Sequence, residues 1–117
     1  MLSQVQIDHY RDAGYLGVEG VFTAQEVAEL QRVTDEFVEK SREVTEHTAD
    51  FDLEPDHTPE MPKLRRLKSP VKSHPVYEAA LRNDRVLDIV SQLVGTEAVR
   101  YNGNKLNMKS GGFGSPV

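Results

Sequence analysis

Histidine and acidic side chains concentrate in one stretch of the sequence, residues 46–62 (EHTADFDLEPDHTPEMP). Side chains of these types hold zinc or a hard cation such as Mg²⁺. The candidates for gathering around one ion are His47, Asp50, Asp52, Glu54, Asp56 and His57. None stands in an H-x-D or H-E-x-x-H arrangement, which would set two ligands on one metal by local geometry. A solvated acidic loop explains the composition more simply, because loop carboxylates are usually hydrated.

Basic side chains follow at once in residues 63–72 (KLRRLKSPVK), and two more lysines, Lys105 and Lys109, stand near the end of the sequence. A basic cluster can bind phosphate or RNA, but the acidic stretch beside it offers internal partners. Lys105 and Lys109 would share one face of a strand, where they form a solvated edge or line a pocket for an anion. Because the sequence contains neither G-x-S-x-G nor G-x-x-x-x-G-K-[ST], no complete active site can be read from its motifs.

The composition excludes several classes of function. A chain of 117 residues forms at most one domain, and its formal charge of −5 disfavours non-specific binding to nucleic acid or to an anionic membrane. It has no cysteine, and therefore no disulfide or thiolate site. No apolar run approaches the roughly 18 residues of a membrane helix, and the first residues lack a signal-peptide pattern. We therefore expect a cytoplasmic protein with no nucleic-acid or membrane partner.

Local patterns predict four helices. Ser3 with Gln6 and Thr23 with Glu26 match the S/T-x-x-E/Q capping box, and Gly14 suits the end of the first helix. Apolar residues recur at three- and four-residue steps through the second helix, at Val27, Leu30, Val33, Phe37 and Val44.

The third helix is predicted to open at Pro75, and the fourth to begin at Asn83 or Asp84 and to end at Gly95. Residues 15–18 and 63–72 are predicted to form strands. From residue 98 onward, alternation predicts a strand whose two faces exchange at Gly103. Residues 46–62, which have three prolines and no periodicity, are predicted to form one long loop.

Four segments, in the same order, resemble the phytanoyl-CoA dioxygenase family of Fe(II)- and 2-oxoglutarate-dependent oxygenases. They are QIDHYRDAGYLGVEGVFTAQEVAELQ, PKLRRLKSP, HPVYEAALRNDRVLDIVSQLVG and NKLNMKSGGFGSPV. The resemblance implies an α+β fold, with N-terminal helices and the first strands of a double-stranded β-helix (jelly-roll, cupin-like), incomplete in this chain. Residues 1–117 would be a single unit, the N-terminal part of a dioxygenase domain, with 46–62 as a lid-like acidic loop.

The iron of this family is held by an H-x-D motif and a distant His, and an Arg anchors 2-oxoglutarate. In family members the H-x-D follows a segment like KSGGFGSPV, whereas this sequence stops at Val117. The resemblance therefore implies Fe(II) and 2-oxoglutarate in the full-length protein, with the metal triad beyond Val117. It assigns no catalytic or metal-binding residue to residues 1–117, and it predicts that this chain alone is inactive and binds neither cofactor.

Three basic residues are carried over by position as cofactor-binding candidates: Lys105, Arg66 and Arg65. The resemblance implies that they contact 2-oxoglutarate or substrate, because a dicarboxylate or CoA-type anion needs cationic partners in a cleft. Only one of the two consecutive arginines can face the pocket of a strand. The alternative for all three is a salt bridge to the 46–60 loop.

Two functions follow from these expectations. In the first, the chain is the N-terminal part of a dioxygenase that hydroxylates a small organic molecule. In the second, it is a catalytically inactive helical interaction module derived from the same fold. A reading frame that continues past Val117 into a His-x-Asp would distinguish them. The apolar helix faces and the edge strand, with little sheet to cover them, also predict self-association.

Overall fold

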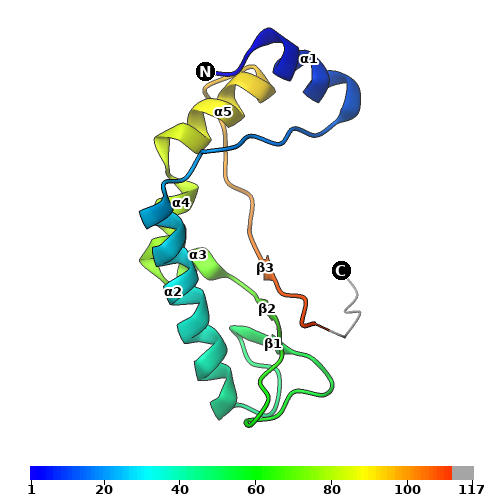
Figure 1. Ribbon diagram of the computed structural model, residues 1–117, viewed down its shortest axis with the longest axis vertical. Coiled ribbons are helices and arrows are strands. Elements are labelled where there is room, and N and C mark those ends of the chain that lie inside the picture. Colours follow the sequence, from blue (N-terminus) through cyan, green and yellow to red (C-terminus); the bar gives the residue numbers. More distant parts are fainter. Residues whose placement is uncertain (112–117) are drawn as a thin grey trace.

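The computed structural model describes residues 1–111 and contains helices packed on one side of a small antiparallel sheet. Figure 1 shows α1 and α5 at one end of a long molecule and the sheet at the other, beside the C-terminal half of α2. The elements are α1 Gln4–Ala13, α2 Ala24–Lys40, η1 Ser41–Glu43, β1 Phe51–Leu53, β2 Leu64–Leu67, α3 Pro70–Ser73, α4 Pro75–Leu81, α5 Asp84–Val94 and β3 Leu106–Asn107. This mixed architecture agrees with the expected α+β class.

The capping boxes and the glycine ends confirm the local predictions, but α2 ends at Lys40, and Val44, which the periodicity placed in this helix, lies beyond η1 in an extended conformation. The Ser3 hydroxyl accepts from the Gln6 amide, and the Gln6 side chain accepts from the Ser3 amide at 2.8 Å. Thr23 and Glu26 form the same box at the start of α2. Helices α1 and α5 end at glycines in the left-handed region, with φ of 82° and 83°. A residue with a Cβ strongly disfavours that conformation, which is why glycine ends both helices.

The sheet has the order β1-β2-β3, and both pairings are antiparallel. Phe51 lies opposite Leu67 and Leu53 opposite Leu64, with a register shift between Asp52 and Leu53. The shift inserts one residue into β2, so that two leucines three positions apart both reach the buried face. The opposite face carries the polar side chains.

The core lies between this sheet, the C-terminal half of α2 and the start of α4. Its buried members are Val33, Phe37, Phe51, Leu53, Leu64, Leu67 and Tyr77. The Tyr77 hydroxyl forms a hydrogen bond of 2.8 Å with the Thr34 hydroxyl, which joins α4 to α2. Helix α5 contributes no buried residue.

Three predictions about strands need correction. Residues 46–62 are not one loop, because Phe51–Leu53 form β1, whose apolar–polar–apolar order matches the two faces of the sheet. Residues 15–18 form no strand, since no neighbouring strand offers them hydrogen bonds. The last predicted strand is limited to Leu106–Asn107 within the described residues, and residues 98–105 are not paired. The strand predicted over residues 63–72 is also shorter than expected, because it is limited to Leu64–Leu67, and Pro70–Ser73 forms a short helix instead.

An ion pair between Glu26 and Arg85 fastens the start of α2 to α5. Both carboxylate oxygens of Glu26 accept from Arg85 Nη2, at 2.7 and 2.6 Å. This hydrogen bond lowers the pKa of Glu26 below its usual value, with the Thr23 amide adding to the effect. A depressed pKa means that the ionised carboxylate stabilises the fold above the unfolded-state pKa, and that this stabilisation disappears as the pH falls through the folded-state pKa.

We therefore expect Glu26→Gln to lower the thermal unfolding midpoint at pH 7 and to have a smaller effect as the pH falls below about 4, near the pKa of an unfolded glutamate. Glutamine keeps the capping hydrogen bond, so the substitution isolates the charge. Circular dichroism melts of wild type, Glu26→Gln and the exposed control Glu19→Gln across pH 3–7 measure the difference. A gap that stays constant over this range would contradict the assignment.

Candidate functional site

Polar and charged side chains on β1 and β2, and on the residues next to these strands, meet around Asp52. Arg66 Nε lies 3.2 Å from Asp52 Oδ2, and Lys68 Nζ lies 3.2 Å from Asp52 Oδ1. His47 Nδ1 is 3.7 Å from the same carboxylate. Antiparallel pairing of Asp52 with Arg66 brings the two backbones together, so the ion pair follows from the register of the sheet.

Three of the four histidines accept hydrogen bonds from backbone amides through Nδ1. The donors are Leu53 for His47 at 3.0 Å, Lys63 for His57 at 2.9 Å and Val76 for His74 at 3.0 Å. His57 Nε2 also lies 3.0 Å from the Val44 carbonyl. These ring nitrogens are therefore used to hold turns and to cap α4. Among residues 1–111, no three histidine or carboxylate side chains are placed to hold one metal ion.

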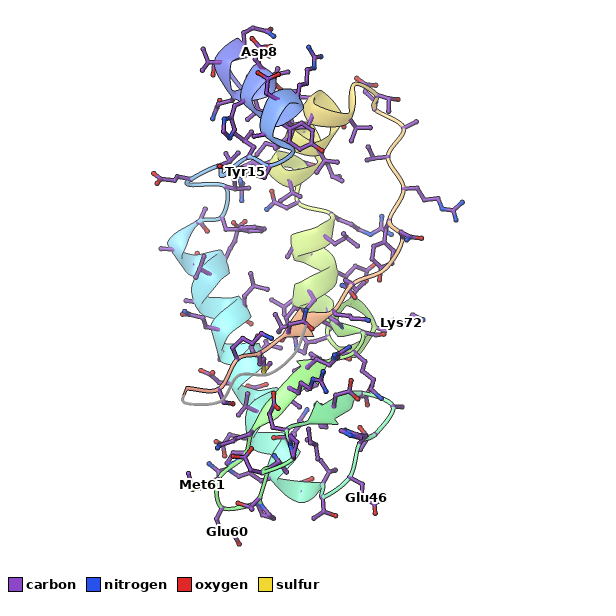
Figure 2. All side chains as sticks on the ribbon, turned by 90° about the vertical axis from the view of Figure 1, so that its right-hand side faces the viewer. Asp8, Tyr15, Glu46, Glu60, Met61 and Lys72 are labelled. Atoms are coloured by element: carbon purple, nitrogen blue, oxygen red, sulfur yellow. The ribbon has the colours of Figure 1, made fainter. Side chains whose placement is uncertain are left out.

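The tip of the predicted lid is tied to its surroundings. Arg42 Nη1 donates to the carbonyls of Pro59 and Glu60, at 2.9 and 3.2 Å. An ion pair joins Lys63 to Asp56, and the hydrogen bond from Lys63 lowers the pKa of Asp56 below its usual value. In Figure 2 the labelled Glu46, Glu60 and Met61 lie at the end of the molecule beyond the sheet, opposite Asp8. Closure of this segment over a site stays a prediction.

The three basic candidates lie on or next to neighbouring strands. Arg65 and Arg66 are half-buried in β2, and Lys105 is exposed immediately before β3. The Met108 amide donates to the Arg65 carbonyl at 2.8 Å, which sets β3 alongside Arg65. Arg66 is engaged by Asp52, which is the salt bridge that the sequence left open as its alternative role. The structure thus brings the three into one region of the sheet, and their contact with an anion remains a prediction.

The sequence suggested Asp52 and Glu54 only as possible metal ligands or as solvated loop carboxylates, and it did not predict the positions that they occupy in the structure. Asp52 is the centre of the ion pairs, and the only available signal was its position between Phe51 and Leu53 in an alternating triplet. Glu54 is 3% exposed, and its Oε1 has no hydrogen-bond partner among the described residues. No sequence pattern distinguishes Glu54 from the solvated carboxylates around it.

Comparison with known proteins adds the family. A family model described as phytanoyl-CoA dioxygenase (PhyH) matches residues 10–117, which is most of the chain. The chain belongs to the phytanoyl-CoA dioxygenase family. It is also similar to a probable alpha-ketoglutarate-dependent hypophosphite dioxygenase of Stutzerimonas stutzeri, with 25% identity over 108 residues. The match covers 92% of this chain and 37% of that relative, so the chain spans little more than a third of the relative's length.

Residues 1–111 bring together no set of side chains that fits a family-type iron site. A non-haem Fe(II) centre needs two imidazoles and one carboxylate converging on the metal, whereas His47, His57 and His74 each use Nδ1 to accept a different backbone amide. The charges on the polar face around Asp52 are one carboxylate and the two cations that it pairs with, Arg66 and Lys68. Within residues 1–111, no helix is long and apolar enough to cross a membrane.

Proposed function

We propose that this chain is the N-terminal part of a non-haem Fe(II)- and 2-oxoglutarate-dependent dioxygenase that hydroxylates a small organic molecule. The match of residues 10–117 to the family carries this proposal, since it includes helices α2–α5 and the whole described sheet. In the proposal, β1–β3 are the first strands of a double-stranded β-helix, and the metal ligands come from polypeptide beyond Val117. The substrate of the bacterial relative is not carried over at 25% identity.

The contribution of this chain would be the binding and orientation of an anion. Lys105 and Arg65 flank the β2–β3 pairing, where one or both would donate to a carboxylate of 2-oxoglutarate or of the substrate. Asp52 holds Arg66 on the polar face of the sheet, and that contact limits the positions its guanidinium can adopt. The helices would form the layer that supports these strands.

Extension of the reading frame beyond Val117 tests the proposal. We expect the extended reading frame to encode a His-x-Asp motif. We also expect the longer polypeptide, loaded with Fe(II), to convert 2-oxoglutarate to succinate. In that polypeptide Lys105→Ala should raise the 2-oxoglutarate concentration for half-maximal turnover by about 10-fold or more, because a lost charge-assisted hydrogen bond costs about 1.5–3 kcal/mol. Lys40→Ala, at an exposed lysine in the last turn of α2, is the matched control and should change this concentration little.

The 117-residue chain supplies the negative reference for this assay. Anaerobic titration with Fe(II) and 2-oxoglutarate should give no visible charge-transfer band with it. A band would show that its own histidines bind iron, and it would contradict the proposed position of the metal ligands beyond Val117. A reading frame that stops after Val117 would overturn the proposal and favour the inactive interaction module.

A further inference from the structure

β1 is an outer strand of the sheet, on the side away from β3 (Figure 1). Along an antiparallel strand, alternate residues direct their backbone N–H and C=O groups toward the partner strand and away from it. The Asp50 carbonyl accepts a hydrogen bond of 2.8 Å from the amide of Lys68, the residue immediately after β2. Residues 50 and 52 therefore face β2, and the backbone groups of Phe51 and Leu53 face the free edge. An open edge of this kind pairs readily with another extended chain.

Two residues of the segment that precedes β1 occupy this edge. The Thr48 amide donates to the Phe51 carbonyl at 2.9 Å, and the Thr48 hydroxyl accepts from the Phe51 amide at 2.9 Å. His47 Nδ1 accepts from the Leu53 amide at 3.0 Å. The outward groups are the N–H and C=O of Phe51 and of Leu53, and among the described residues only the Leu53 carbonyl lacks a donor. The chain itself thus satisfies most of the edge.

Lys68 holds this segment in place from the β2 side. Its Nζ donates to the Thr48 carbonyl at 2.7 Å and lies 3.2 Å from Asp52 Oδ1. The Thr48 hydroxyl also accepts from the Asp50 amide at 3.1 Å. An incoming strand would have to displace all of these hydrogen bonds together. It would gain little in return, because an edge strand of three residues offers few backbone groups for new pairs.

We propose that His47 and Thr48 close the free edge of β1 against strand addition, so that no extended segment of another chain pairs with β1. Covering an edge strand with a loop is a common way in which proteins prevent such pairing. A three-stranded sheet has two edges, so a further strand of the proposed dioxygenase domain then pairs beside β3. That consequence rests on the proposed function, whereas the closed edge rests only on contacts within this chain.

Amide hydrogen exchange of the full chain, measured residue by residue by NMR, tests the closed edge. We expect the Phe51 and Leu53 amides to be protected about as well as the Glu54 amide, which donates to a carbonyl on the β2 side at 2.9 Å. The double substitution His47→Ala with Thr48→Val removes both acceptors. It should accelerate exchange of the Phe51 and Leu53 amides by about 10-fold, because the loss of a typical hydrogen bond corresponds to a change of that size. Exchange of Glu54 should change less.

His9→Ala with Thr58→Val is the matched control, because it removes the same residue types away from β1. The Thr58 hydroxyl accepts from the Met61 amide at 3.0 Å, so the control also loses a hydrogen bond between a threonine and a backbone amide. It should leave exchange of the two edge amides unchanged. Thr48→Ser keeps the hydroxyl and should behave as wild type, which separates the lost acceptor from a general loss of folding.

Sedimentation velocity over a hundredfold range of protein concentration measures the consequence for pairing. We expect the double variant at His47 and Thr48 to associate more strongly than wild type and than the control. Wild-type Phe51 and Leu53 amides that exchange as fast as those of an unfolded chain would overturn the proposal. A double variant that associates no more than wild type would overturn it as well. Neither measurement uses iron or 2-oxoglutarate, so a failure here is distinct from a failure of the proposed function.

Discussion

Leu67→Ala is expected to lower the free energy of unfolding by about 2–5 kcal/mol, the range for removing a leucine side chain from a packed core. Leu67 is fully buried, and it lies opposite Phe51 in the pairing of β1 with β2. Since small domains are stable by only about 5–15 kcal/mol, this change would leave a substantial unfolded fraction. Urea unfolding followed by circular dichroism measures it.

Met61→Ala is the control for the core substitution. It removes a side chain of similar size that is 65% exposed, so we expect a loss within about 0.5 kcal/mol. Leu67→Ala should also destabilise the packing of the sheet. We therefore expect backbone amide hydrogen exchange to accelerate more in β1 and β2 than in α1. Equal losses for the two variants would show that the sheet does not form the core described above.

The parts of the fold that could be predicted are those whose signals lie within a few residues. A capping box needs only its Ser3–Gln6 or Thr23–Glu26 pair, and a left-handed end needs only a glycine such as Gly95. These interactions form between neighbours along the chain, so a pattern of three or four residues is enough to recognise them.

Strands could be predicted less well, because a strand requires a partner that the local sequence does not name. Residues 15–18 and 98–105 have suitable alternation but no pairing, whereas Phe51–Leu53, inside an acidic and proline-rich stretch, pair with β2. Leu16 and Val18 instead line a groove whose opposite wall is formed by Val86, Ile89 and Val90 of α5. Whether each of these three segments forms a strand therefore depends on its tertiary contacts and not on its local pattern.

In the candidate site too, signals along the chain could be predicted and contacts between distant residues could not. Lys105, Arg65 and Arg66 were predicted from the resemblance to a family. That resemblance is a similarity in the order of segments along the chain. The ion pair between Asp52 and Arg66 depends on the register of two strands, and the register depends on an irregularity next to Leu53. Histidine roles were equally hidden, because a ring that accepts a backbone amide six residues away has no fixed motif.

Asp52→Asn is expected to lower the free energy of unfolding by about 1–3 kcal/mol. This lies between the values for exposed ion pairs, at about 0–1 kcal/mol, and for the loss of one partner of a buried pair, at about 3–5 kcal/mol. The Asp52 side chain is 22% exposed, and those of Arg66 and Lys68 are 19% and 35% exposed. Asparagine has nearly the same shape but no charge, so two half-buried cations lose their shared counter-ion.

Asp50→Asn tests whether the effect belongs to the ion pairs rather than to the net charge of the chain. Asp50 is exposed and lies two residues before Asp52. Because each substitution replaces an aspartate by an asparagine, both variants change the formal charge equally. Urea unfolding at low and at 1 M salt should show a large loss for Asp52→Asn that screening only partly removes, because partly buried charges are shielded less than exposed ones. Equal effects of the two substitutions would mean that Asp52 is only one of many surface charges and does not hold Arg66 in place.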